Sequence, residues 1–162
     1  MNIQKATSDK DIKRIADLAT IIWHEHFATI LSPEQIDYMV EKFQSYDAIK
    51  KAVNEEGYTY YMAEVDGDFC GYLGIHDEGN GVIFISKVYV RSDMRKKGIA
   101  TQLLEKLKAD FPDAEKWYLT VNKYNYGSIA VYERRGFKKV KDLVTDIGNG
   151  FIMDDYVMEK VI

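Results

Sequence analysis

The first part of the chain shows apolar residues at helical spacing, after a short stretch typical of a strand. "IQKAT" (residues 3–7) predicts an opening strand. Over residues 9–28 the apolar positions fall on one side of a helix, and Ser8 stands where a helix cap belongs. The stripe consists of Ile12, Ile15, Leu18, Ala19, Ile22, Trp23 and Phe27. We expect this stripe to face a sheet.

Two more helices are predicted before the pattern changes. "SPEQIDYMVEKF" (32–43) begins with Ser32 as a cap and Pro33 at the first helical position, and Gln35 completes a capping box. "YDAIKKAVNE" (46–55) predicts a third, short helix.

From Tyr58 onward the pattern is that of strands. "YTYYMAEV" (58–65) and "FCGYLGIH" (69–76) flank Asp-Gly-Asp, which predicts a hairpin. "GNG" at 79–81 predicts a turn into a third strand, "VIFISKVYV" (82–90).

The second half of the chain alternates helices and strands. Gly136 follows "YERR", where a helix C-terminus favours a left-handed residue. A hairpin at "GNG" (148–150) joins the last two strands. The predicted elements are a helix over 98–110, a strand over 116–121, a helix over 126–135, and strands over 137–144 and 151–161. An antiparallel sheet that continues through a strand–helix–strand crossover predicts a mixed α+β fold, and without repeats or linkers we expect residues 1–162 to form one domain.

Composition narrows the class of protein. Apolar residues make up 46% and charged residues 30%, which is typical of a soluble globular protein. The net charge of −4 argues against general nucleic-acid binding and mildly favours a small cationic substrate. Cys70 is the only cysteine, which excludes an internal disulfide, fits a reducing compartment and is expected to be structural. Without a signal-peptide pattern after Met1 or an apolar run of roughly 18 residues, we expect a cytoplasmic protein with no membrane partner.

"VYVRSDMRKKGIATQLLEKL" (88–107) places Arg91, Arg95, Lys96 and Lys97 directly before a predicted helix. A helix N-terminus carries about half a positive charge, so cations there cost roughly 0.3–1 kcal/mol each unless an anion binds. The stretch lacks the "GK[ST]" ending of a P-loop and the glycine triplet of a dinucleotide fingerprint. It predicts backbone amides that bind a pyrophosphate, with a solvated basic turn as the alternative.

This stretch resembles the acyl-CoA-binding signature of the GNAT superfamily of N-acetyltransferases, Q/R-x-x-G-x-G/A after a strand. Arg95, Gly98 and Ala100 occupy its three specified positions. "VNKYNYGSIAVYERRGF" (121–137), one strand further on, resembles the family's second common element. The matching residues there are Asn125, Ala130, Tyr132, Gly136 and Phe137. The resemblance implies a GNAT-like fold, with a central mixed, mostly antiparallel sheet of about seven strands flanked by helices.

The resemblance also implies acetyl-CoA as cosubstrate, without a metal. Backbone amides from Arg95 to Thr101 would cradle the pyrophosphate, and main-chain groups of residues 88–90 would pair with pantetheine and polarise the acyl carbonyl. The implied cofactor-binding residues are Val88, Tyr89, Val90, Arg95, Lys96, Lys97, Gly98, Ile99, Ala100, Thr101, Asn122 and Asn125. Tyr132 is the expected acid for the departing thiolate. The alternative is that Asn125 only caps a helix and Tyr132 only packs.

The attacking amine must become neutral, and the sequence offers no obvious base for this step. An amine of pKa near 10.4 is less than about 0.1% neutral at pH 7. Many family members carry a glutamate on the strand before the CoA loop, but this chain has Ser86 and Lys87 there. We expect Lys87 to face solvent or a carboxylate rather than to act as a base. His24 and His26 diverge by roughly 200° around a helix, and we expect surface or capping roles for both.

"ILSPEQIDYMV" (30–40) lies where this family commonly builds the wall of the acceptor site. It offers Glu34, Asp37 and Tyr38, of which Asp37 and Tyr38 could meet a cation. The alternative is that these acids are solvated and simply favourable to the dipole of their helix.

In "FIMDDYVMEKV", Asp154 and Asp155 must point to opposite faces of a strand. One carboxylate is therefore expected to be covered, and it needs either a structural partner, which we favour, or a bound ammonium. Tyr156 shares the face of Asp154 and would add an aromatic wall.

Together these observations predict an acetyl-CoA-dependent N-acetyltransferase that acts directly on a primary amine. The acidic balance favours a small cationic amine such as a polyamine, and the alternative within the class is a protein N-terminus or lysine. A non-catalytic acyl-CoA-binding module is the alternative outside it. Relatives in the family often dimerise, so the resemblance leaves a homodimer open.

Overall fold

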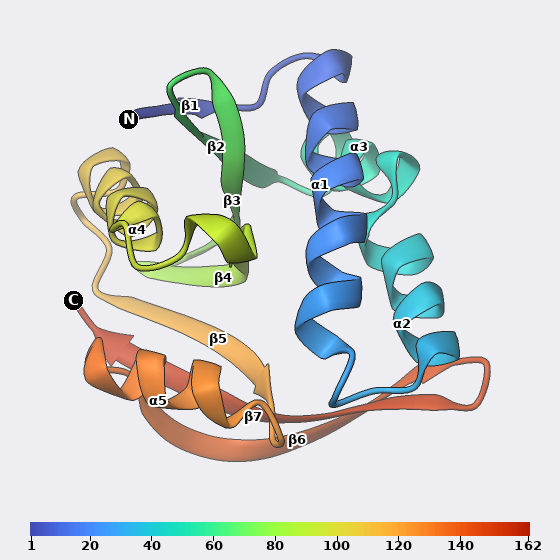
Figure 1. Cartoon of the computed structure of the whole chain (residues 1–162). Helices are drawn as coiled ribbons and strands as arrows, with labels where there is room; N and C mark the ends of the chain where they lie inside the picture. The colour runs from blue at the N-terminus through green and yellow to red at the C-terminus, as the bar shows by residue number, and fades with distance from the viewer. The chain divides into compact units, whose positions relative to one another are not determined.

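The computed structural model describes residues 1–162 as helices around a seven-stranded sheet (Figure 1). The strand order is β1-β2-β3-β4-β5-β7-β6, and all the pairs described below are antiparallel except β4 with β5. This confirms the predicted mixed α+β class. The chain divides into two compact units, one of residues 1–76 and 87–112 and the other of residues 77–86 and 113–162. No helix combines the length and apolar character that a membrane span requires.

The elements follow the predicted order closely. The first part of the chain contains β1 (Asn2–Lys5), α1 (Asp9–Phe27), α2 (Pro33–Met39), a π-helical turn (Val40–Gln44), α3 (Tyr46–Glu55), β2 (Tyr58–Val65), β3 (Asp68–Gly79) and β4 (Val82–Val90). A 3₁₀ turn (Ser92–Met94), α4 (Ile99–Asp110), β5 (Lys116–Asn122), α5 (Tyr126–Arg134), β6 (Lys138–Gly148) and β7 (Phe151–Val161) complete it.

The predicted helix caps are present. Ser8 Oγ accepts from the Asp11 amide at 3.1 Å and the Asp11 carboxylate accepts from the Ser8 amide, which forms a full capping box. Ser32 accepts from the Gln35 amide at 3.2 Å, whereas the Gln35 side chain lies 3.8 Å from the sulfur of Met39. The Ser32 half of that predicted box is therefore confirmed.

The second predicted helix, over 32–43, changes type in its second half. Regular α-helix ends at Met39, and the residues Val40–Gln44 form a π-helical turn. The wider turn brings two polar groups to the sheet: Gln44 Oε1 accepts from Tyr72, and the carbonyl of Phe43 accepts from Lys87. Apolar spacing cannot reveal this widening, because the partners lie on distant strands.

Three tight hairpins have the predicted turn residues. Asp66-Gly67, Asn80-Gly81 and Asn149-Gly150 all have positive φ at both positions, as type I′ turns require. Two of the strands that they join are longer than predicted, since β3 extends to Gly79 and β6 to Gly148.

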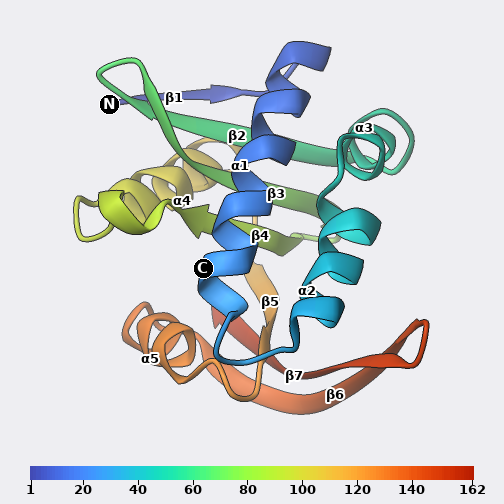
Figure 2. The same cartoon turned by 45° about the vertical axis from the view of Figure 1, so that its right-hand side comes forward.

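In the first unit, α1, α2 and α3 cover one face of β1–β3 and α4 covers the other (Figure 2). Every residue of the predicted α1 stripe is buried. The fully buried Tyr60 and Tyr72 stack at 6.4 Å between ring centroids. Gly74 makes room for this layer, because a Cβ there would lie 2.9 Å from the Tyr60 ring.

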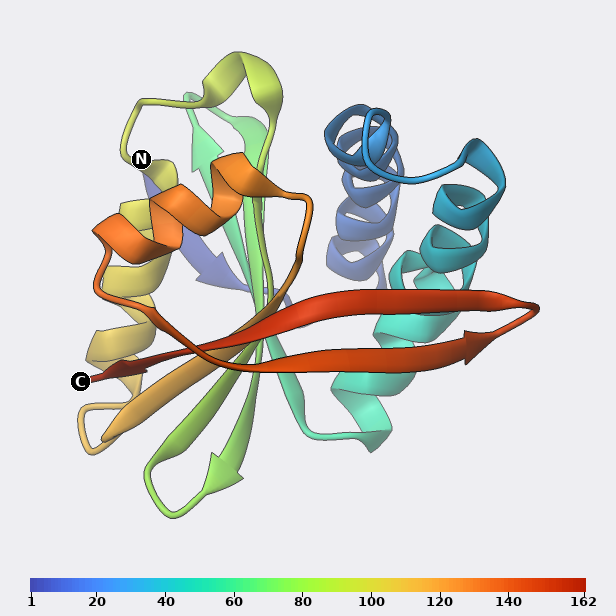
Figure 3. The ribbon, with the colours of Figure 1, turned by 90° about the horizontal axis from the view of Figure 1, so that it is seen from below.

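In the second unit, β5 lies between β4 and β7, and the hairpin β6–β7 is seen beside α5 (Figure 3). The parallel pairing of β4 with β5 runs from Val82–Lys116 to Phe84–Tyr118. Beyond it β5 continues to Asn122, paired along its length with β7. The carboxyl end of a strand with a parallel neighbour is a common place for a ligand.

Candidate active site

The loop before α4 contains two left-handed residues and leads into a helix end without a side-chain cap. Lys96 has φ +63° and Gly98 has φ +78°, both in the left-handed region. Gly98 is the N-cap of α4, and no side chain caps this helix end. Arg95, which precedes Lys96, is extended, with φ −73° and ψ 163°, so the backbone changes hand at Lys96 and again at Gly98 before α4 begins. That amides from Arg95 to Thr101 cradle a pyrophosphate stays a prediction.

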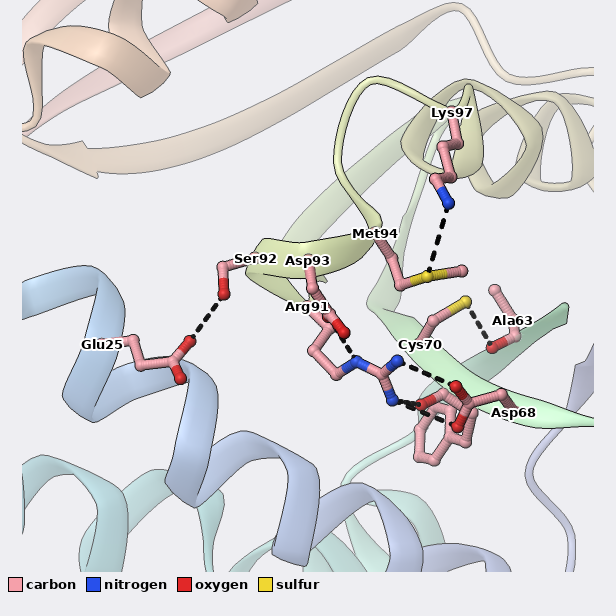
Figure 4. Close-up of polar contacts among 10 residues, drawn as sticks. Glu25, Ala63, Asp68, Cys70, Arg91, Ser92, Asp93, Met94 and Lys97 are labelled. Carbon is pink, nitrogen blue, oxygen red and sulfur yellow. Dashed lines mark hydrogen bonds and ion pairs between the residues drawn. The ribbon is translucent and has the colours of Figure 1, made fainter.

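Three of the four predicted cations of this stretch are exposed. Arg95, Lys96 and Lys97 are all exposed, and Lys97 Nζ lies 3.9 Å from the sulfur of Met94 (Figure 4). Their charges add to the positive end of the α4 dipole.

Arg91, the fourth cation, is held by two carboxylates. Its guanidinium donates to both oxygens of Asp68 at 3.1 and 2.8 Å and to Asp93 at 2.6 Å (Figure 4). These contacts lower the pKa of both carboxyls. Because its main-chain N–H also donates to the carbonyl of Cys70 at 2.8 Å, Arg91 fixes the end of β4 where the loop begins.

The Ser92–Met94 turn is tied to α1. Ser92 Oγ donates to Glu25 at 3.0 Å (Figure 4). On the same helix, the pKa of His26 is lowered by burial and by the nearby charge of Arg95. The end of α1 therefore lies beside the loop.

The β4 residues expected to meet pantetheine alternate in direction. The ring of Tyr89 lies 5.7 Å from those of Trp23 and Tyr72, which places it on the α1 side of the sheet. Val88 and Val90 therefore point to the opposite face. That their main-chain groups bind the cofactor stays a prediction.

Lys87 is half-buried, and its ammonium contacts two uncharged oxygens rather than a carboxylate. Its Nζ donates to the Tyr60 hydroxyl at 2.7 Å and to the Phe43 carbonyl at 3.2 Å. Burial lowers the pKa of Lys87 to about 8, partly offset by the charge of Glu56. Sequence reasoning missed Gln44 and Tyr60 as members of this buried polar cluster, because no local pattern marks them.

The second predicted motif forms a capped helix. Asn125 Oδ1 accepts from the Ser128 amide at 3.3 Å, so Asn125 is the N-cap of α5. This is the capping role that the sequence analysis gave as the alternative. Asn122 Oδ1 accepts from the Tyr124 amide at 2.9 Å and shapes the turn after β5. Cofactor contacts by either asparagine stay predictions.

Tyr132 on α5 is half-buried and packs edge-on against Phe137, with 5.7 Å between ring centroids. Burial raises the pKa of Tyr132 to about 12, which keeps the phenol protonated at neutral pH. A protonated phenol is the form that a general acid needs. Its role as the acid stays a prediction.

His24 has a structural role, as expected. Its two ring nitrogens lie 2.7 Å from the Thr20 carbonyl and 2.6 Å from the Asp37 carboxylate. Both partners are hydrogen-bond acceptors, which favours the protonated ring. The hydrogen bonds to Asp37 and Thr20 raise the pKa of His24. The partner of Asp37 is thus His24 of α1.

Other candidates on the α2 segment have ordinary surroundings. Glu34 is exposed, and Tyr38 lies under Lys42, whose Nζ is 5.6 Å from the ring centroid. Cys70 is fully buried, and its thiol donates to the Ala63 carbonyl at 3.4 Å. Burial raises the pKa of this thiol, so Cys70 is structural, as predicted.

The two aspartates of β7 face opposite ways, as predicted. Asp154 forms an ion pair with Lys123 at 2.8 Å, and Tyr156 on the same face lies between Lys123 and Lys139 at 5.7 and 4.1 Å. Asp155 is only 4% exposed, and burial raises its pKa to about 6. The structural partner that we expected for the covered carboxylate is instead found on Asp154.

Comparison with known proteins identifies the family. The model described as "Acetyltransferase (GNAT) family" matches residues 15–137. An N-alpha-acetyltransferase of Saccharolobus solfataricus is 35% identical over 67% of this chain and 72% of its own, and one of Sulfurisphaera tokodaii is 30% identical over 80% of each. The Thermoplasma acidophilum PaiA N-acetyltransferase, solved with coenzyme A, superposes with a TM-score of 0.80 at 19% identity, covering all of both chains. The chain belongs to the GNAT family of acetyl-CoA-dependent N-acetyltransferases.

Proposed function

We propose that this acetyltransferase acts on the α-amino group at the end of a peptide. The observation that carries the transferase chemistry is the uncapped start of α4, with its left-handed Lys96 and Gly98. This backbone suits the diphosphate of acetyl-CoA, and Arg95, Lys96 and Lys97 add charge-assisted contacts.

The roles of the chain's own groups follow from the reaction. A main-chain N–H near Val88 polarises the thioester carbonyl, where negative charge develops during attack. Tyr132 gives a proton to the departing sulfur, because its raised pKa of about 12 keeps the phenol protonated. Cys70 takes no part in the reaction, since its buried thiol lacks the thiolate character of a nucleophile. The acetyl group therefore passes directly from acetyl-CoA to the amine.

Two observations favour an α-amino group as the acceptor: the names of three relatives and the low pKa of α-amino groups. Three relatives at 35%, 30% and 31% identity are named N-alpha-acetyltransferase. An α-amino group has a pKa of about 7.7–8.0, so roughly a tenth of it is neutral at pH 7, against less than about 0.1% of a lysine-like amine. Because more of this amine is already neutral, it depends less on a catalytic base, which suits a chain that lacks the family's strand glutamate.

A small cationic amine such as a polyamine is the second candidate. The net charge of −4 favours it, as the sequence suggested.

Thiol release from acetyl-CoA tests the proposal. The panel holds peptides with a free N-terminus and varied first residues, the same peptides with a blocked N-terminus, polyamines and aminoglycosides. We expect kcat/KM above about 10⁴ M⁻¹s⁻¹ for at least one free peptide, and background rates for its blocked form. Turnover confined to polyamines would establish the second candidate. Binding of acetyl-CoA without turnover of any amine would favour the non-catalytic binding module.

A further inference from the structure

We infer that Asp155 on β7 binds the ammonium group of the acceptor and takes a proton from it. This inference rests on the proposed acetyl transfer and supplies the base that the sequence did not reveal. It does not depend on whether the amine belongs to a peptide or to a small molecule.

The argument begins with the unpaired state of Asp155. The residue is only 4% exposed, yet its carboxylate has neither a hydrogen bond nor an ion pair within the protein. Asp154, next to it, pairs with Lys123 on the other face at 2.8 Å. A buried carboxylate without a partner is costly, and an incoming ammonium would relieve that cost.

The strand neighbours directly beside Asp155 carry no charge. By register its row contains Asn122 of β5 and Leu143 of β6, neither of which is ionisable. Lys141, opposite Val157, is exposed and lies one row along the same face. Lys123 lowers and Asp154 raises the pKa of Asp155, and burial is the largest cause of its rise to about 6.

The position of Asp155 suits an acceptor. It pairs with Asn122, the last residue of β5, at the carboxyl end of the strand that runs parallel to β4. Ligands commonly bind at such strand ends. The turn that follows leads directly into α5, which carries Tyr132.

Asp155 and α5 lie on opposite faces of β5 and β7. Gly136, just past α5, lies against the side chain of Lys160, and Lys160 Nζ is 5.8 Å from the Trp117 ring centroid. Lys160 is five residues from Asp155, so their side chains point to opposite faces. The attacking nitrogen and the departing sulfur are different atoms of the tetrahedral intermediate, so the proposed base and acid need not share a face.

The proton balance is complete. Asp155 takes one proton from R–NH₃⁺ and later releases it to water. The neutral amine attacks the thioester carbon, so a C–N bond forms and the C–S bond breaks. Sulfur leaves as a thiolate and takes the phenolic proton of Tyr132. The second proton that the nitrogen loses restores the Tyr132 phenol, which leaves the amide, free thiol and one released proton as products.

Two isosteric variants test the inference. Asp155→Asn removes the carboxylate, whereas Asp154→Asn alters its neighbour on the opposite face and serves as the control. We expect D155N to lower kcat/KM at pH 7 by about 100-fold or more, and D154N to change it only a few-fold. Equal effects of the two variants, both folded by thermal melting, would overturn the inference.

The pH profile of the wild type keeps the test decisive even where D155N does not fold. If Asp155 accepts the proton, log kcat/KM rises to about pH 6 and then levels off until the amine itself titrates. A profile that climbs without a plateau to the amine's own pKa would contradict this role. Failure of wild-type transfer with every amine would instead refute the proposed function, so the two failures are distinguishable.

Discussion

Replacing Gly98 with alanine separates the strain of the loop from its role in binding. Gly98 has φ +78°, and a Cβ there would meet no atom within 4 Å. The substitution therefore adds no clash, but it forces an L-residue into the left-handed region at a cost of about 1–2 kcal/mol. For a chain of this size, each kcal/mol lowers Tm by about 2–4 °C.

Gly67 provides a matched control. It has φ +79°, and a Cβ there also meets nothing within 4 Å, but it lies in the hairpin between β2 and β3. Gly67→Ala and Gly98→Ala should therefore destabilise the fold equally. Only G98A places a methyl group on the backbone that the diphosphate approaches.

Calorimetric titration with coenzyme A then measures the difference between the two variants. We expect G98A to bind at least about 10-fold more weakly than G67A, which is 1.4 kcal/mol of binding free energy. Equal affinities of the two variants for coenzyme A, with equal losses of Tm, would refute the assignment of the pyrophosphate to this loop.

Three further predictions concern single side chains. Tyr132→Phe should lower kcat by about 10- to 1,000-fold while coenzyme A affinity is retained. The loss is limited because a thiolate leaves fairly easily without an acid, and an unchanged kcat would remove Tyr132 from the mechanism. Lys87 has its pKa lowered from 10.5 to about 8, so the folded state binds fewer protons than the unfolded state between these values, and stability rises with pH there. Urea unfolding should show that the free energy of unfolding of wild type rises by up to about 3 kcal/mol relative to that of Lys87→Met between pH 7 and 10.5. A difference between the two proteins that does not change with pH would contradict a lowered pKa for Lys87. The pKa of His24 is raised in the fold, so its pairing with Asp37 stabilises most below the unfolded pKa of 6.5 and is lost as pH rises through the folded value. The stability advantage of wild type over Asp37→Asn should therefore shrink from pH 5.5 to pH 8, and an advantage that grows would show that the ring is not protonated in the pair.

Local chemistry was readable from the sequence because it depends on near neighbours. The Ser8 cap and the Asn-Gly turns are satisfied within four residues, so near neighbours alone determine their geometry. The opposite directions of Asp154 and Asp155 follow from strand alternation in the same way.

What the sequence could not provide depends on partners far along the chain. Arg91 finds Asp68 at a separation of 23 residues, and Lys87 finds Tyr60 at 27. Neither pairing has a local signal, so the sequence grouped Arg91 with the cations of the loop and suggested solvent or a carboxylate for Lys87. Likewise, either β7 aspartate could have met Lys123, and only the packed strands determine that Asp154 does.

The most direct test of the central claim uses one peptide with a free α-amino group and one internal lysine. It is incubated with acetyl-CoA and the protein at pH 7, and tandem mass spectrometry locates the acetyl group. The proposed function predicts acetylation of the α-nitrogen alone. Acetylation of the lysine side chain alone, or an unmodified peptide beside an acetylated polyamine in the same tube, would contradict it.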